Sequence, residues 1–113
     1  DWIYFLDDDN IVKEDWYQHI CPYLNSDAAI LTWGQVYENG EERLFPTTKP
    51  GPFKIDTACF MVNWTHVKDI RWGVASESDG QYAQDCAKDK LIMIHHDLCY
   101  YNYISGRKHP NNN

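Results

Sequence analysis

Apolar and polar residues follow one another along the chain in blocks that predict both strands and helices. Residues 2–6 form a continuous apolar run, Trp-Ile-Tyr-Phe-Leu, and polar residues follow it directly. A strand that is apolar on both faces is typical of the centre of an α/β sheet, so residues 2–6 are predicted to form a buried central strand. The run leads into Asp7-Asp8-Asp9-Asn10, which places three carboxylates and an amide at the end of that strand.

The next block predicts a helix over residues 13–24, because Trp16, Ile20 and Leu24 recur every four residues and form one apolar stripe. Pro22 is expected to kink or end this helix. The remaining pattern predicts helices and strands without an internal repeat or a linker. We expect one α/β domain over residues 1–104 and a polar tail over 105–113. The predicted strands are 28–37, 53–63 and 91–94, the predicted helices are 64–70 and 79–90, and residues 98–104 form a strand or a helix. A turn is expected at 38–41 and a proline-rich loop at 45–52.

Composition and charge exclude some classes of function and leave the predicted fold as it is. The 113 residues leave room for one small domain, and 43% hydrophobic with 24% charged residues is typical of a globular chain. The net charge of −7 argues against binding of duplex nucleic acid, which requires a basic face. No apolar run approaches the roughly 20 residues that a membrane-spanning helix needs. We therefore expect neither a nucleic-acid partner nor a membrane span.

The four cysteines, Cys21, Cys59, Cys86 and Cys99, each lie next to apolar residues. Their spacing matches neither a zinc site nor a Cys-X-X-Cys pair. We predict four buried free thiols and a reducing compartment, the cytoplasm, because disulfide frameworks belong to smaller, loop-rich secreted chains.

Three adjacent carboxylates at Asp7, Asp8 and Asp9 repel one another, and a divalent cation would neutralise them. Mg²⁺ and Mn²⁺ prefer carboxylate oxygens, and Mg²⁺ in proteins commonly also holds substrate phosphates. One interpretation is therefore a metal site for a phosphate-bearing ligand. The alternative is a solvated turn, since Asp and Asn also favour turns and helix starts. A calcium EF-hand is excluded because Val12 stands where that loop requires glycine.

The run from Trp2 to Asn10 resembles the Asp-X-Asp motif of GT-A-type nucleotide-sugar glycosyltransferases, in particular the family-2 type. Further segments match that family in order: residues 53–64 resemble its acceptor-side strand, Glu77-Ser78-Asp79 its Glu-Asp motif, and residues 98–103 its closing aromatic segment. The resemblance implies a partial GT-A fold, with a mixed sheet and flanking helices, that corresponds to the C-terminal part of the catalytic domain. An N-terminal nucleotide-binding half would precede it in the family.

This resemblance implies the transfer of a sugar from a nucleotide-diphospho-sugar donor to an acceptor hydroxyl, with inversion at the anomeric carbon. Asp9 and Asp7 would bind Mn²⁺ or Mg²⁺, Asp7 would also lie near the nucleotide ribose, and Asp8 would support nucleotide binding. The cation would hold the donor diphosphate and stabilise the charge that develops on the leaving nucleoside diphosphate. The acceptor would be a carbohydrate or another hydroxyl compound.

The Glu-Asp motif of the family implies that Asp79 is the general base. The family usually has Glu directly beside Asp, whereas Ser78 intervenes here, so Glu77 is the alternative base. The other interpretation of Asp79 is a helix cap, and a capping residue can also face a cleft.

A late histidine serves many relatives as a further metal ligand, which here would be His96, with His95 and His109 as alternatives. Successive strand residues point to opposite faces, so at most one of the adjacent pair is expected to face the site. Trp72 lies in the loop before Glu77 and is the candidate aromatic surface for binding the acceptor.

Two other functions remain open at this point. A sugar-phosphate nucleotidyltransferase shares a similar sheet and a metal-binding acid, and a non-catalytic module that binds a metal or a glycan would retain the fold without the reaction. We further expect the chain to be inactive without the nucleotide-binding half. An exposed sheet edge would then favour pairing with a second copy as a homodimer.

Overall fold

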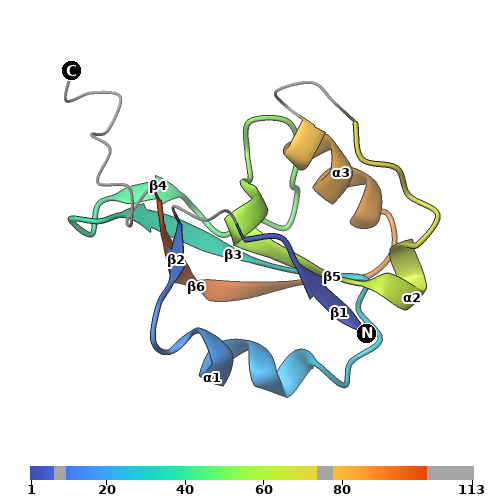
Figure 1. Ribbon diagram of the computed structural model, residues 1–113, viewed down its shortest axis with the longest axis horizontal. Helices are drawn as coiled ribbons and strands as arrows, with labels where there is room; N and C mark the ends of the chain where they lie inside the picture. The colour runs from blue at the N-terminus through green and yellow to red at the C-terminus, as the bar shows by residue number, and fades with distance from the viewer. Residues whose placement is uncertain (7–9, 74–77, 102–113) are drawn as a thin grey trace.

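A mixed β-sheet forms the frame of the molecule, and short helices lie against both of its faces (Figure 1). The computed structural model describes residues 1–6, 10–73 and 78–101. The strand order is β1-β5-β3-β6-β2, and β4 pairs with β3. The strands are β1 (Trp2–Tyr4), β2 (Ile11–Val12), β3 (Ile30–Tyr37), β4 (Glu42–Leu44), β5 (Phe60–Asn63) and β6 (Leu91–Tyr101), and the helices are α1 (Trp16–Ile20), η1 (Cys21–Tyr23), η2 (Thr57–Cys59), α2 (Trp64–Val67) and α3 (Ser78–Cys86).

Strand β3 is the centre of this sheet. Seven of its eight residues are buried, and its sequence, Ile-Leu-Thr-Trp-Gly-Gln-Val-Tyr, is rich in residues that favour strands. It pairs in antiparallel orientation with β4 and β5 and in parallel orientation with β6. The prediction of a strand at 28–37 is confirmed, and so are the mixed sheet and the flanking helices.

Strand β1 differs from the prediction of a central strand at 2–6. In the part of the chain that the structure describes, β1 pairs with β5 alone, and its three residues are half-buried. Its apolar side chains are covered by aromatic rings rather than by a second strand, since Tyr4 stacks on Trp16 with ring centroids 5.3 Å apart. The continuous apolar run therefore reflects packing against rings, not a place at the middle of the described sheet.

Strand β6 runs unbroken from Leu91 to Tyr101, whereas the sequence predicted two segments separated at His95-His96-Asp97. The polar residues stay in the strand because the parallel pairing with β3 continues past them, with register shifts on both sides of Gly34. Gly34 pairs with Asp97, and a side chain there would collide with the Asp97 carboxylate. The missing Cβ thus leaves room for an acidic residue inside the sheet.

The helices are shorter than predicted. The α-helix predicted over 13–24 spans only Trp16–Ile20 and passes into the 3-10 turn η1, which contains Pro22, so the proline ends the helix as expected. The strand predicted over 53–63 is confined to its last four residues. Asp56 caps the turn η2 ahead of it by accepting a hydrogen bond from the Thr57 amide. The strand β4 was not predicted, because its charged sequence carries no strand pattern.

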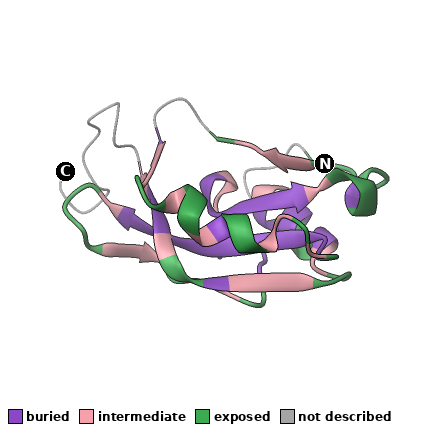
Figure 2. Cartoon of the chain, turned by 90° about the horizontal axis from the view of Figure 1, so that it is seen from below, coloured by how far each residue is buried: buried purple, intermediate pink, exposed green. Residues whose placement is uncertain are grey.

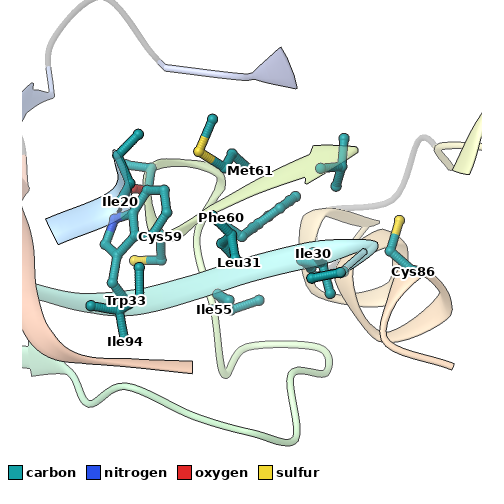
Figure 3. Close-up of a cluster of buried hydrophobic side chains, with 14 of the residues drawn as sticks. Ile20, Ile30, Leu31, Trp33, Ile55, Cys59, Phe60, Met61, Cys86 and Ile94 are labelled. Atoms are coloured by element: carbon teal, nitrogen blue, oxygen red, sulfur yellow. Dashed lines mark hydrogen bonds between the residues drawn. The ribbon is translucent and has the colours of Figure 1, made fainter. Parts of the chain in front are cut away.

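The hydrophobic core lies on both sides of β3 and β5 (Figures 2 and 3). Trp33 is its largest fully buried side chain, and the indole Nε1 donates a hydrogen bond to the Ala58 carbonyl at 2.8 Å. The Tyr4 hydroxyl donates to the same carbonyl at 2.6 Å. This shared acceptor joins β1, β3 and η2 around one buried polar atom. The other core side chains labelled in Figure 3 are Ile20, Ile30, Leu31, Ile55, Cys59, Phe60, Met61, Cys86 and Ile94.

All four cysteines are free thiols, as predicted, and Cys59, Cys86 and Cys99 are buried. The prediction of burial is wrong for Cys21, which is exposed at the start of η1, where the chain leaves α1. Within residues 1–6, 10–73 and 78–101, the structure contains no helix of the length and apolar character that crossing a membrane requires.

The start of α3 packs directly on the proline-rich loop at 45–52. A Cβ at Gly80 would lie 2.7 Å from the Pro52 Cα and closer still to the Gly51 backbone. Such distances leave no room for a methyl group, so the absence of a side chain at Gly80 allows the helix and the loop to meet.

We predict that Gly80→Ala destabilises the fold by about 1–3 kcal/mol, the usual cost of overpacking, because backbone atoms cannot yield as a flexible side chain would. Gly51→Ala is the matched control, since its Cβ would meet its nearest neighbours at 3.9 Å, an ordinary contact. Urea denaturation followed by tryptophan fluorescence measures both variants. Equal midpoints for the two would contradict the close contact.

Candidate functional site

A pocket of about 190 Å³ lies where α3 begins. Strand β4, the turn after the proline-rich loop, the segment before η2 and the first turn of α3 all contribute to its walls. Asp79, which the sequence identified as the candidate base, is part of this lining. The lining residues are Arg43, Leu44, Phe53, Ile55, Asp56 and Asp79.

Asp79 is a half-buried acid in the first turn of α3. Its Oδ1 accepts a hydrogen bond from the Gly80 amide at 2.8 Å. Burial raises the pKa of the Asp79 carboxyl, and the negative charge of Asp56 raises it further, while the Gly80 amide and the Arg43 guanidinium act in the opposite direction. A raised pKa is the direction that a carboxylate needs in order to accept a proton near neutral pH.

A buried amide organises the charged groups of the pocket. Gln35, in β3, has no exposed surface, and its Nε2 donates to Asp56 Oδ2 at 3.1 Å. Its Oε1 accepts a hydrogen bond from Arg43 Nη1 at 2.6 Å. The same Nη1 lies 4.0 Å from Asp56 Oδ2, and the Arg43 Cζ lies 3.8 Å from the centroid of the Tyr101 ring. Both charged side chains are therefore held in fixed positions at the pocket.

Phe53 stands at this pocket in a backbone conformation that is rare for its residue type. Its φ of 66° is positive, a value that costs a non-glycine residue on the order of 1–3 kcal/mol. Its side chain is 78% exposed. An exposed aromatic ring in a strained turn at the edge of a pocket is an outlier of the kind that concentrates at functional sites.

Most of the other predicted site residues lie outside the part of the chain that the structure describes. Asp7, Asp8, Asp9 and Glu77 lie outside the described residues, and so does the alternative ligand His109. Within the residues that the structure describes, no three His, Cys, Asp or Glu side chains are grouped as metal ligands would be. The predicted ligands Asp7 and Asp9 are carboxylates, and this hard oxygen donor set suits Mg²⁺ or Mn²⁺.

His96 is exposed on β6, and its ring centroid lies 3.8 Å from that of His19 in α1. His19 Nε2 in turn lies 3.3 Å from Asp15 Oδ2. Figure 1 shows α1 and α3 on opposite faces of the sheet, so His96, beside α1, and Asp79, within α3, lie on opposite faces. The structure does not bring these two predicted site residues together.

Trp72 packs on α3. Its ring stacks on Tyr82 with centroids 4.3 Å apart and meets Phe5 edge-on at 5.0 Å. Tyr82 lies three residues after Asp79 in α3, so Trp72 contacts the helix about one turn beyond the candidate base. Only about a third of its surface is exposed, 36%, because these rings cover the rest.

Sequence reasoning missed Gln35, Arg43, Asp56 and Phe53. Only Gln35 carried a signal, as an amide within a strand segment that is mostly apolar. The others come from segments far apart along the chain, and their assembly depends on the pairing of β4 with β3 and on the turn before η2.

A second pair of acids, Glu42 and Asp97, was missed as well. Glu42 in β4 pairs with Val36 of β3, and Asp97 in β6 pairs with Gly34 of the same strand. Glu42 Oε2 and Asp97 Oδ1 are buried and have no hydrogen-bond partner among the described residues. Burial, followed by the interaction with the neighbouring Asp97 carboxylate, raises the pKa of Glu42 to about 7, and Lys13 acts in the opposite direction.

Comparisons with models of protein families, with curated proteins and with solved structures find no match to this chain.

We predict that the Asp79 carboxyl titrates above the ordinary value of 3.8. Asp56→Asn removes a neighbouring negative charge and keeps an oxygen that can cap η2, so it should lower the pKa of Asp79. Titration of the Asp79 carboxyl carbon by ¹³C NMR measures this pKa in the unmodified chain and in Asp56→Asn. A midpoint at or below 3.8 in the unmodified chain would contradict the assignment.

We also predict that Glu42 makes the fold less stable as the pH rises. The pKa of Glu42 is about 7 in the folded state, against an ordinary 4.5, so its favourable contribution is complete below pH 4.5 and is lost between pH 4.5 and 7. Glu42→Gln should flatten the fall in the urea midpoint over that interval. Identical pH profiles for both proteins would show that Glu42 titrates normally.

Proposed function

We propose that the chain is a catalytic segment of a metal-dependent glycosyltransferase that moves a sugar from a nucleotide-diphospho-sugar to an acceptor hydroxyl, with inversion of the anomeric carbon. The observation that carries this proposal is Asp79: a half-buried carboxylate with a raised pKa, in a pocket whose other charged groups are fixed by hydrogen bonds. The Asp-X-Asp resemblance supplies the donor side of the proposal.

In this mechanism, Asp79 acts as the general base. Its Oδ1 accepts a hydrogen bond from the Gly80 amide, so Oδ2 is the oxygen that takes the proton of an acceptor hydroxyl. As that proton leaves, the hydroxyl oxygen forms a bond to the anomeric carbon of the donor, and the bond from that carbon to the diphosphate oxygen breaks with its electron pair on the diphosphate. Arg43 and Asp56 set the charge around the base, since Arg43 lowers and Asp56 raises its pKa.

Asp7 and Asp9 would hold Mn²⁺ or Mg²⁺ in this proposal, and Asp8 would support the bound nucleotide. A cation held there supplies charge stabilisation for the departing nucleoside diphosphate. Participation of His96 as a third ligand requires its ring to leave His19, because the two rings are in contact. Asp9 is therefore the more direct residue to test. Glu77 remains the alternative to Asp79 as base.

A second candidate function is a glycan-binding module without catalysis. Phe53 favours it, because an exposed aromatic ring beside carboxylates can bind a sugar whether or not a metal is present. The two functions differ in their dependence on the metal, and this difference decides the experiment.

We predict that the chain binds Mn²⁺, that added UDP tightens this binding, and that Asp9→Ala weakens it by at least about tenfold, the loss seen even when a residue that only supports a metal ligand is removed. Electron paramagnetic resonance of free Mn²⁺ during a protein titration measures the affinity. Asp69→Ala, at an exposed position in the loop after α2, is the matched control and should bind as the unmodified chain does. Binding that Asp9→Ala leaves unchanged would refute the transferase proposal.

A further inference from the structure

We propose that Phe53 is the stacking surface for a neutral saccharide acceptor at the mouth of the Asp79 pocket, an inference that rests on the proposed glycosyl transfer. It replaces Trp72 as the principal aromatic contact for the acceptor.

Exposure distinguishes Phe53 from the other aromatic residues near Asp79. Trp72 and Tyr82 stack on one another with ring centroids 4.3 Å apart, so these ring faces cover each other. Among the described residues, no aromatic ring packs on Phe53, which leaves 78% of the side chain open. The apolar C–H face of a pyranose can cover such a ring, as an aromatic or aliphatic side chain would in a core.

The polar lining matches the hydroxyl groups of a sugar. Asp56 and Asp79 present carboxylate oxygens, which accept hydrogen bonds from hydroxyl donors. The guanidinium of Arg43 is already engaged by Gln35 and by the Tyr101 ring. An anionic sugar would therefore meet two carboxylates and a single guanidinium that already has partners, so the pocket favours a neutral sugar.

The size of the pocket limits what can enter. About 190 Å³ is smaller than the 300–1,000 Å³ of typical pockets for drug-sized ligands. Leu44 and Ile55 provide its apolar wall. One sugar ring can insert next to Asp79, and any further residues of a longer glycan would lie outside, on the Phe53 side.

The turn that carries Phe53 is tied to the helix that carries the base. The Lys54 amide donates to the Gly51 carbonyl at 3.0 Å, which closes the turn around residues 51–54. Gly51 in turn contacts the backbone at Gly80, directly after Asp79. A backbone turn fixed in this way needs little ordering when the ligand binds, and that preorganisation favours affinity.

The test is saturation-transfer-difference NMR of the 113-residue chain with the methyl β-glycosides of glucose, galactose and N-acetylglucosamine, with and without Mn²⁺ and UDP. The methyl glycoside of glucuronic acid is the anionic comparison. Phe53→Gly removes the ring and accepts the positive φ without strain, so it isolates the side chain from the backbone. Phe53→Trp retains a stacking face, and Phe45→Ala is the matched control, because Phe45 is 73% exposed and does not line the pocket.

We expect at least one neutral glycoside to bind more tightly than the glucuronide, Phe53→Gly to weaken it about tenfold, and Phe53→Trp and Phe45→Ala to retain it. Absence of binding by every neutral glycoside, equal binding of the glucuronide, or an unchanged affinity in Phe53→Gly would overturn the proposal. Saccharide binding that requires Phe53 in a chain that fails to bind Mn²⁺ would support the stacking surface and refute the transferase. If metal binding requires Asp9 but glycoside binding does not depend on Phe53, the result would support the transferase and refute the stacking surface.

Discussion

The buried amide of Gln35 is the interaction on which the candidate site depends. It lies in the central strand, where an unpaired amide would cost free energy, and it satisfies both of its polar ends with charged partners, Asp56 and Arg43. Those partners come from β4 and from the turn before η2, so one side chain joins three segments of the chain. Hydrogen bonds to charged groups are stronger than those between neutral ones, which makes this junction both stable and specific in geometry.

Part of this fold follows from local sequence. The strand at 30–37 forms where β-branched and aromatic residues are dense, and Pro22 ends the first helix. The rest depends on tertiary contacts. Strand β6 continues through His95, His96 and Asp97 because β3 provides its hydrogen bonds and because Gly34 leaves space beside it. No feature of those three polar residues by themselves distinguishes a strand from a loop.

The candidate site was predictable to a similar extent. Asp79 was identified through a motif and is found half-buried in a pocket, whereas Asp56 and Arg43, whose charges add to the effect of burial on its pKa in opposite directions, carried no local signal. Their effect on Asp79 is electrostatic and depends on distance in space, which sequence separation does not reveal. Trp72 was selected for its place in the chain near Glu77. Packing against Tyr82 and Phe5 leaves Trp72 36% exposed, whereas Phe53 is 78% exposed, a difference that only the folded chain shows.

The direction of α3 explains why Asp79 lies where it does. Strands β3 and β6 are parallel, and the start of β6, at Leu91, pairs with the start of β3, at Ile30. The helix α3 ends at Cys86, shortly before β6 begins, so it must run back along the sheet toward that end. Its first turn, with Asp79, then lies toward the carboxyl ends of the parallel strands, near Gln35 in β3. Ligands of open α/β sheets bind at the carboxyl ends of the strands, and the parallel pairing therefore places the acid where a substrate would be expected.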